Sequence, residues 1–398
     1  MPRHRSTASR ALAFSAVLLA LLLASCAPAA PTADPSAVQT QVFQSALLTA
    51  TYAVPASTAT PAPTLTPSLP PPTPTAVRTP PALPAVFQTG LLRAGDLPHT
   101  YVEDTCQYLK NRLDPNKSAP GTVVMPIMFH SITDGEVTKD NQISVEQFKQ
   151  LMRDLKDQGF ETVTAEELAA FLEDNAKIPP RSMILIVDDR HYAQYFEDHF
   201  LPHVQENGWT VTNAWISTPN STQDLIDSMA GVISAGWVDV QAHGVVHNIP
   251  IDNSSSEEFI RSELFGSIEF IQQHFQQTPI AYIWPTGSFT KRGAEVAREA
   301  GYRLGFTVNP RGPVMYNWVP LAEAADPGRP SYMPEGPIGD PLMVLPRYWD
   351  TDAHLHIDTV RQIGKEAAQY AAEHRQTELD YYDIICLPVT GEIPPLAP

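Results

Sequence analysis

Short apolar segments alternate with amphipathic ones through the last two thirds of the chain. Each apolar segment is rich in aliphatic residues and is bounded by turn residues, which is typical of strands buried on both faces. The segments expected to be strands are residues 122–129, 182–187, 210–216, 237–241, 280–284, 304–308, 342–345 and 383–387.

Helices are expected between these strands. Ser144 with Gln147, and Thr164 with Glu167, have the spacing of a capping box, which marks the first turn of a helix. Regular alternation of strand and helix predicts a parallel sheet with right-handed crossovers, either a barrel or a doubly wound sheet. We favour an α/β fold built as an irregular (β/α) barrel with fewer than eight units. Further helices are expected at residues 221–235, 255–275 and 291–300.

The first 26 residues have the pattern of an export signal. Arg3, Arg5 and Arg10 precede an apolar run at 11–24 that is short for a bilayer span, and small residues lead from it to Cys26. This arrangement resembles a bacterial lipoprotein signal, which implies that cleavage leaves Cys26 as a lipidated first residue anchored in a membrane. An ordinary signal peptide cut nearby is the alternative. Both predict an exported protein, and the anchor would hold it at the cell surface or the periplasmic face of a membrane.

The composition changes twice after this signal. Residues 27–85 are mostly Pro, Thr, Ala and Ser with almost no charge, so we expect a disordered, extended spacer without a core of its own. Residues 86–120 are expected to be a lead-in, and residues 121–398 the main folded domain.

The chain is acidic and contains few cysteines. A formal net charge of −18 argues against nucleic acid as a partner, because binding phosphates requires clustered Lys and Arg and no basic stripe occurs. After Cys26, only Cys106 and Cys386 remain. In an oxidising compartment they can form a disulfide if the fold brings them together, and two separate buried thiols are the alternative.

Residues that are unusual for a buried core, most of them polar, recur immediately after the expected strands. In parallel α/β folds the carboxyl ends of the strands converge on one rim, where active sites are built. We therefore expect these residues to surround a single site. They are His130, Asp188, Asp189, His243, Trp284, Pro285 and Arg347.

Two pairs of residues near this rim, one of aspartates and one of histidines, have the chemistry of metal ligands. Asp188 and Asp189 leave an apolar strand together, and two carboxylates that start near the core need a cation or hydrogen-bond donors to stay charged. Capping of the next helix explains one aspartate but not both. His243 and His247 are four residues apart and can reach one ion, although a bare pair with this spacing is more often two unrelated surface histidines. With one aspartate they would form a facial two-histidine, one-carboxylate ligand set.

These residues resemble the motifs of the polysaccharide deacetylases, carbohydrate esterase family four. Residues 186–189 (Ile-Val-Asp-Asp) resemble the strand-ending T-F-D-D motif of that family, and residues 243–247 resemble its H-[S/T]-x-x-H motif. Segments 284–287 and 345–347 resemble its later Pro-Tyr-Gly turn and Leu-Pro-Arg segment. The resemblance covers about residues 121–387.

The segment at residues 125–132 indicates a narrower branch of the family. It resembles the leading strand of the poly-β-1,6-N-acetylglucosamine deacetylases, in which the acid histidine stands at the start of the domain. That resemblance implies that His130 is the acid. It would also explain why the expected last strand, at residues 384–388, lacks a histidine.

The resemblance implies an enzyme that hydrolyses N-acetyl groups of an extracellular polysaccharide containing N-acetylglucosamine, with residues 121–398 as its catalytic domain. Asp189, His243 and His247 would hold a divalent metal ion. Zn²⁺ is the ion expected first, with Co²⁺, Ni²⁺ and Mn²⁺ as alternatives. The polysaccharide, and a membrane reached through Cys26, are the expected partners.

The resemblance also assigns roles to the remaining rim residues. Asp188 would accept a proton from water as general base, and His130 would approach from the opposite side to donate a proton to the leaving nitrogen. A histidine satisfied by a backbone carbonyl in the core is the alternative for His130. Arg347 would keep Asp188 ionised, or would form only a salt bridge at the rim.

Three residues depart from the family pattern. Arg190 replaces a glycine, Val187 a Phe or Thr position, and Thr286 a tyrosine. Two alternatives to an enzyme follow: a noncatalytic glycan-binding surface lipoprotein with a degenerate deacetylase site, and a solute-binding lipoprotein. The retention of all five candidate metal and acid–base residues favours the enzyme.

Overall fold

The computed structural model describes residues 78–397. The expected signal peptide, Cys26 and most of the spacer at 27–85 lie outside the described residues. Across residues 78–397, none of the helices combines the length and the apolar character needed to cross a membrane.

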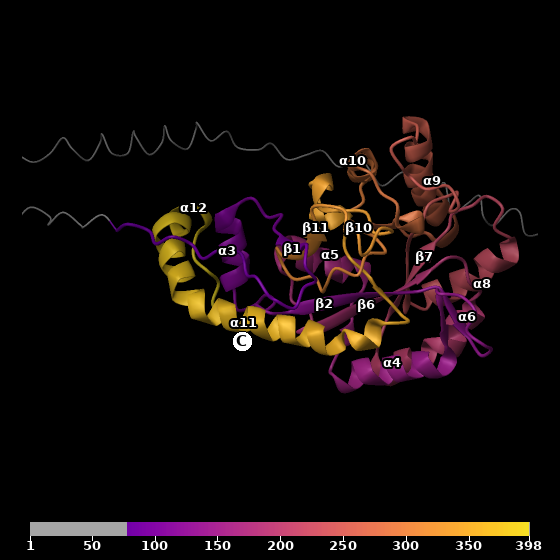
Figure 1. Ribbon diagram of the computed structural model, residues 1–398, viewed down its shortest axis with the longest axis horizontal. Coiled ribbons are helices and arrows are strands. Elements are labelled where there is room, and N and C mark those ends of the chain that lie inside the picture. The colour runs from indigo at the N-terminus through magenta and orange to yellow at the C-terminus, as the bar shows by residue number, and fades with distance from the viewer. Residues whose placement is uncertain (1–77, 398) are drawn as a thin grey trace, which may run out of the picture. The chain divides into compact units, whose positions relative to one another are not determined.

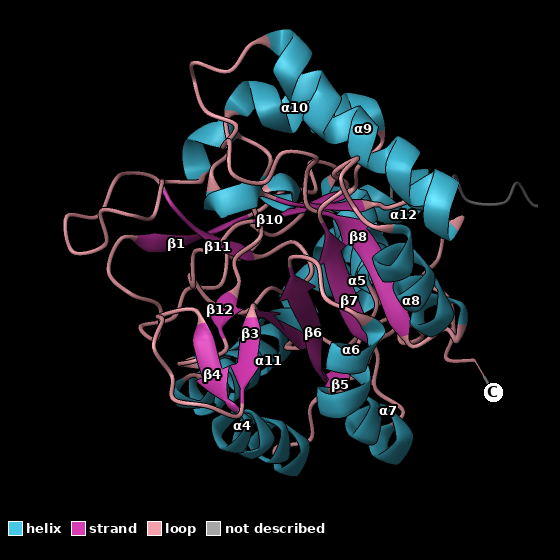
Figure 2. Cartoon of the chain, turned by 90° about the vertical axis from the view of Figure 1, so that its right-hand side faces the viewer, coloured by secondary structure: helices cyan, strands magenta, loops and turns pink. Residues whose placement is uncertain are grey.

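A parallel sheet forms the centre of the fold (Figure 2). Its strands are β2 Val123–Phe129, β5 Glu161–Thr162, β6 Arg181–Asp188, β7 Val211–Trp215, β8 Val238–Ala242, β9 Ala281–Ile283, β10 Leu304–Phe306 and β12 Tyr348–Trp349. They lie in the order β10-β9-β8-β7-β6-β2-β12, with β5 beside β6, and every pairing is parallel. β2 is buried along its whole length and β6 beyond its first residue, as continuous apolar runs predict.

The two edges of this sheet are joined through Leu345. Its backbone N–H donates to the carbonyl of Gly305 at 2.8 Å, and its own carbonyl accepts from the N–H of Thr307 at 2.9 Å. The chain then continues into β12, which pairs with β2 at the other edge. The sheet therefore closes into an irregular barrel with fewer than eight strands on its circuit, which confirms the predicted fold class.

Helices surround the sheet, as Figure 2 shows. The helices are α3 Thr105–Leu113, α4 Val145–Asp157, α5 Ala165–Asp174, α6 Ala193–His199, α7 Leu201–Asn207, α8 Gln223–Ser234, α9 Glu257–Phe275, α10 Lys291–Ala300, α11 Ile357–Tyr381 and α12 Leu387–Thr390. Both capping boxes form: Ser144 and Gln147 begin α4, and Thr164 and Glu167 begin α5. The three other predicted helices correspond to α8, α9 and α10.

Two expected strands are wrong. Residues 341–343 form a 3-10 turn, η3 Pro341–Met343, because prolines at 341 and 346 restrict this short buried segment. Residues 383–387 lie at the end of the long helix α11, where a π-helical turn, η5 Tyr382–Cys386, leads into α12. A short apolar run does not distinguish a strand from a buried helix segment, and here the preceding helix continues through it. The absence of a histidine from a last strand therefore has no meaning in this chain.

The lead-in at residues 86–120 is part of the same folded unit. It contributes α3 and the strand β1 Asp96–His99, which pairs antiparallel with β11 Val319–Ala322. Even Ala85, the last residue of the expected spacer, accepts a hydrogen bond from the Tyr370 hydroxyl on α11 at 2.8 Å. The remaining short elements are β3 Ser131–Thr133, β4 Gln142–Ser144 and the 3-10 turns η1 Pro285–Gly287, η2 Gly336–Ile338 and η4 Ala353–Leu355.

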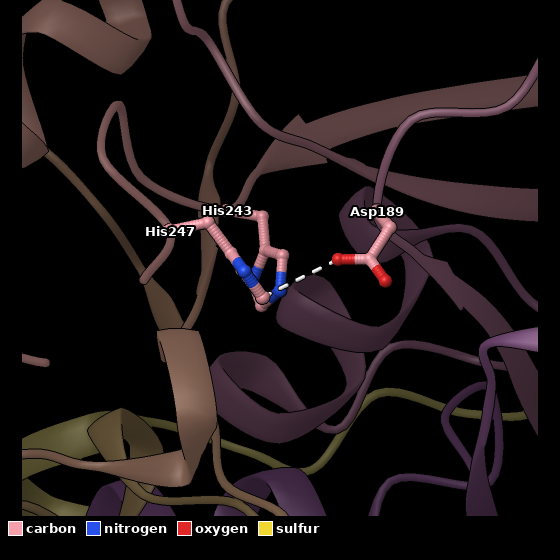
Figure 3. Close-up of side chains that lie close together, drawn as sticks. All are labelled: Asp189, His243 and His247. Atoms are coloured by element: carbon pink, nitrogen blue, oxygen red, sulfur yellow. Dashed lines mark ion pairs between the residues drawn. The ribbon is translucent and has the colours of Figure 1, made fainter. Parts of the chain in front are cut away.

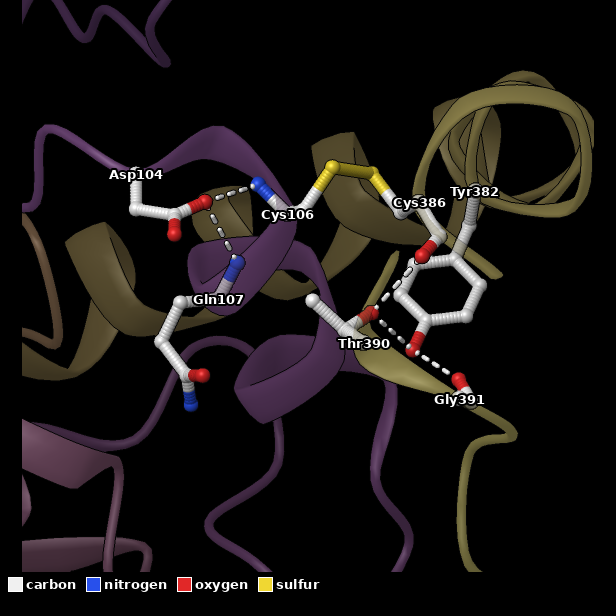
Figure 4. The surroundings of a disulfide bond; sticks show 7 residues. All are labelled: Asp104, Cys106, Gln107, Tyr382, Cys386, Thr390 and Gly391. Atoms are coloured by element: carbon white, nitrogen blue, oxygen red, sulfur yellow. Dashed lines mark hydrogen bonds between the residues drawn. A yellow bond between two sulfur atoms is a disulfide. The ribbon is translucent and has the colours of Figure 1, made fainter. Parts of the chain in front are cut away.

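A disulfide joins the lead-in to the C-terminal helices. Cys106 in α3 is bonded to Cys386 at the end of η5, with their Cα atoms 5.1 Å apart, which decides between the two alternatives for these cysteines. Asp104 caps α3 beside the bond, and the Tyr382 hydroxyl donates to the Gly391 carbonyl on the other side (Figure 4). Figure 1 shows α3 and α12 together at one end of α11.

Candidate active site

Strand β6 ends at two aspartates with different surroundings. Asp188 is the last residue of β6 and is buried, whereas Asp189 follows it with a left-handed backbone (φ +73°) and a partly exposed side chain. Asn213 on the neighbouring β7 donates from Nδ2 to the carbonyl oxygens of Val187 (3.0 Å) and Asp189 (3.2 Å), which stabilises this unusual turn. The turn allows the two carboxylates to face different groups.

The loop after β8 folds around a glutamate. Two of its backbone N–H groups donate to the carboxylate of Glu263 on α9, at 2.8 and 3.0 Å. Gly244 has a left-handed backbone (φ +77°), and a Cβ atom there would lie 2.7 Å from Glu263 Oε2, so the close approach requires glycine. The loop thereby places His247 next to His243, with their ring centroids 4.9 Å apart.

Asp189, His243 and His247 point toward one another (Figure 3). One ligand atom from each lies within 4.8 Å of the others, and His247 Nε2 is 3.3 Å from Asp189 Oδ1. His243 Nδ1 donates to the Ile283 carbonyl at 2.8 Å, which leaves its Nε2 free to bind a metal. Asp189 Oδ1 is buried without a hydrogen-bond partner in the described chain. Two imidazoles and an unsatisfied carboxylate oxygen fit a divalent metal ion, so the chain has a possible metal site here.

Burial lowers the pKa of His243, because desolvation disfavours the charged imidazolium more strongly than nearby Asp188 favours it. His243 is therefore neutral near pH 7. A neutral imidazole is the form that binds a metal ion.

Asp188 is paired with Arg347, and both side chains are buried. Arg347 donates from Nη1 to Oδ1 at 2.6 Å and from Nη2 to Oδ2 at 3.0 Å, and its Nε donates to the Thr307 carbonyl at 2.8 Å. Burial acts to raise the pKa of Asp188, but the Arg347 guanidinium, followed by His243 and His130, outweighs it and lowers this pKa to about 2. The carboxylate therefore stays ionised at every pH at which the protein would function.

His130 lies beside Asp188. It is the first residue after β2, which neighbours β6, and its Nε2 is 3.6 Å from Asp188 Oδ2. Its ring stacks on Trp349 with centroids 5.5 Å apart and planes 11° apart. Its Nδ1 is buried and has no hydrogen-bond partner in the described chain, so the expected alternative of a carbonyl-satisfied core histidine does not describe this residue. His130 therefore flanks the buried carboxylate of Asp188.

Asp350 is a polar residue of the site that the motifs did not identify. It directly follows β12, and its N–H donates to the Met128 carbonyl near the end of β2. Both of its carboxylate oxygens are buried without a partner in the described chain, and burial raises its pKa to about 8. Its position immediately after a short aromatic strand is the same signal that marked the other rim residues.

Two further rim residues have different surroundings. Trp284 is buried and donates its indole N–H to the Met343 carbonyl at 2.8 Å, so it belongs to the core. Arg190 is exposed, and its Nη1 lies 3.4 Å from Ser221 Oγ, outside the group of candidate metal ligands.

A family model described as polysaccharide deacetylase matches residues 175–305. Residues 175–305 are therefore similar to the polysaccharide deacetylases. The matched residues include both aspartates and both metal-site histidines, whereas His130 and Arg347 lie outside them.

One curated relative and two solved structures are similar to this chain. The chain is 22% identical over 185 residues to the polysaccharide deacetylase YxkH of Bacillus subtilis strain 168. This match covers 46% of this chain and 64% of that protein, which is less than two thirds of its length. The structure of the Streptococcus pyogenes deacetylase PplD in complex with acetate is 20% identical and covers 58% of this chain and 93% of that chain, with a TM-score of 0.44. IcaB from Ammonifex degensii is 14% identical and covers 62% and 98%, with a TM-score of 0.45.

Proposed function

We propose that this deacetylase hydrolyses N-acetyl groups of a polysaccharide containing N-acetylglucosamine, using one divalent metal ion. The observation that carries the proposal is the convergence of Asp189, His243 and His247 beside the buried Asp188–Arg347 pair. Two imidazoles and one carboxylate leave coordination positions open for a reactant, as a catalytic metal site requires.

The ligand set favours Zn²⁺, with Co²⁺, Ni²⁺ and Mn²⁺ as alternatives, because imidazole nitrogens suit these ions better than they suit Mg²⁺ or Ca²⁺. When bound, the ion would polarise the acetyl carbonyl and make water a better nucleophile near neutral pH. The Ile283 carbonyl supports the site, because it accepts a hydrogen bond from His243 Nδ1 and so fixes the orientation of the ring.

Asp188 would accept the proton that water loses as its oxygen bonds to the acetyl carbon. Each carboxylate oxygen has about two lone-pair positions, and Arg347 takes one on each, so Asp188 retains acceptor capacity. Arg347 would keep Asp188 ionised and correctly oriented. A carboxylate with so low a pKa is a weak base, so Asp188 would depend on an acidified water.

His130 would donate a proton to the nitrogen as the carbon–nitrogen bond breaks. The products are acetate and a free amine on the sugar. Because His130 Nε2 lies 3.6 Å from Asp188 Oδ2, the proton taken up at Asp188 has a short path to His130. Stacking on Trp349 fixes the plane of the imidazole. Asp350 at the end of the adjacent strand would tune the charge of this pocket.

The deacetylase would act outside the cytoplasm and be held to a membrane by a lipid on Cys26. Support for this proposal comes from the basic, apolar and small-residue sequence of residues 1–26. Incorporation of labelled palmitate into the wild-type protein, but not into a Cys26→Ser variant, is the expected result. Equal incorporation of palmitate into both proteins would refute a lipid anchor on Cys26.

Acetate release from N-acetylglucosamine oligomers tests the proposed function directly. The wild-type protein should release acetate, whereas Asp188→Asn should bind the same oligomers and release at least ~10²-fold less. A noncatalytic glycan-binding protein would bind the oligomers equally in both forms and release no acetate from either. That outcome, with metal present, would refute the proposal that the protein is an enzyme.

A further inference from the structure

Arg190 is an arginine at the active-site rim without a carboxylate partner. It follows the candidate metal ligand Asp189 directly, and its side chain is exposed. Its one hydrogen bond within residues 78–397 is the 3.4 Å contact with the Ser221 hydroxyl, and no carboxylate there lies within 4.0 Å of it. Most other arginines in this part of the chain pair with Asp or Glu, so Arg190 is one of the few whose charge is left available to a ligand.

Exposed apolar side chains occur on the loops of the same rim. Tyr192, two residues after Arg190, is 54% exposed. Val246 and Ile249, on the loop that contains His247, are 42% and 52% exposed. These side chains lie on the loops that follow β6 and β8, the strands that present the candidate metal ligands. An exposed aromatic ring and aliphatic side chains beside a catalytic site suit the apolar faces of sugar rings.

The charge balance of the rim favours an anion next to these faces. Arg347 compensates Asp188 inside the barrel. Asp189 faces the metal site. Arg190 is therefore the uncompensated charge of this turn, and its planar guanidinium matches a carboxylate with two parallel hydrogen bonds.

We propose that Arg190 is a specificity residue that binds the carboxylate of an acidic sugar next to the acetylated one. The preferred substrate is then an acidic N-acetylated polysaccharide, such as one that contains uronic acids. This inference rests on the proposed deacetylase function and narrows its substrate class.

Two substrates with one backbone test the inference: chitohexaose, and chitohexaose oxidised at C6 so that some sugars bear a carboxylate. We expect the wild-type enzyme to release acetate from the oxidised oligomer with a kcat/KM about tenfold higher, mainly through a lower KM, since a charge-assisted hydrogen bond contributes at least this much. Arg190→Gln should lose the preference and keep its rate on chitohexaose. Arg190→Lys should keep part of the preference.

Arg181→Gln is the matched control, because Arg181 is an exposed arginine at the opposite end of the same strand, β6. It should keep the full preference, which would exclude a general effect of net charge. An equal preference in Arg190→Gln and the wild type, or a wild-type preference for chitohexaose, would overturn the inference.

Calorimetric binding of the oxidised oligomer separates this inference from the proposed function. Weaker binding by Arg190→Gln than by the wild type supports the anion site even if neither protein releases acetate, in which case only the proposed function fails. Equal affinity of the two proteins overturns the anion site whatever the activity.

Discussion

Replacement of Arg347 by methionine should make folding stability strongly dependent on pH. Arg347 is fully buried and forms two hydrogen bonds with Asp188. Methionine fills much of the same volume but leaves the Asp188 carboxylate buried without a cation. Burial, the largest influence on this group, is then opposed only by the nearby histidines and raises the pKa of Asp188 above the ordinary 3.8.

The structure gives the size and sign of the effect. In the wild type the pKa of Asp188 falls from 3.8 to about 2, which corresponds to roughly 2–3 kcal/mol of stability at about 1.36 kcal/mol per pKa unit. Because the folded-state pKa is lowered, this contribution is present above pH 3.8 and is lost as the pH falls toward 2. In Arg347→Met the folded-state pKa is raised, so ionisation of Asp188 opposes folding at neutral pH. Removing one partner of a buried ion pair costs about 3–5 kcal/mol.

Urea unfolding of chelated protein at pH 5 and pH 8 measures the effect without interference from metal. We expect Arg347→Met to lose about 3–5 kcal/mol at pH 8 and less at pH 5, where more Asp188 is protonated. The double variant Asp188→Asn/Arg347→Met should recover stability at pH 8 and lose the pH dependence. An equal loss at both pH values, with no recovery in the double variant, would show that Arg347 acts only through packing.

Three further predictions concern His130, the disulfide and the glycine that shapes the His247 loop. His130→Gln should reduce kcat for acetate release by ~10²–10⁴-fold at unchanged metal content, and a rate close to that of the wild type would exclude His130 as the acid. Cys106→Ser/Cys386→Ser should lower the free energy of unfolding by up to ~5 kcal/mol in the loop-entropy account, since the disulfide joins residues 280 apart; urea unfolding that matches the wild type would contradict this. Gly244→Ala should reduce bound metal measured by mass spectrometry, because its Cβ would displace the Glu263 carboxylate that holds the His247 loop, whereas Gly208→Ala, in an open turn with φ +70°, should not.

Short-range signals in the sequence predicted much of the fold. Ser144 and Thr164 identified two helix starts because a capping box involves residues only three apart. The strands that contain the candidate ligands were also recognisable, because burial on both faces requires continuous apolar runs. Since parallel strands end at one rim, the polar residues that follow them could be expected to converge.

Long-range contacts account for what the sequence did not reveal. The segment at 383–387 is helical because α11 continues into it and Cys386 bonds to α3, and neither cause is visible within five residues. Asp350 joins the site because β12 pairs with β2, but a two-residue strand has no periodicity to detect. The position of His130 beside Asp188 depends on β2 and β6 being neighbours, which alternation of strands and helices does not specify.

Titration of the chelated protein with Zn²⁺, followed by acetate release from N-acetylglucosamine oligomers, tests the proposed metal site most directly. We predict that activity is absent after chelation, rises linearly and stops rising at about one ion per chain. His243→Ala should bind no stoichiometric metal and release no acetate at the same concentrations. Full acetate release from chelated wild-type protein, or equal Zn²⁺ binding by wild type and His243→Ala, would contradict the assignment of Asp189, His243 and His247 as the metal site.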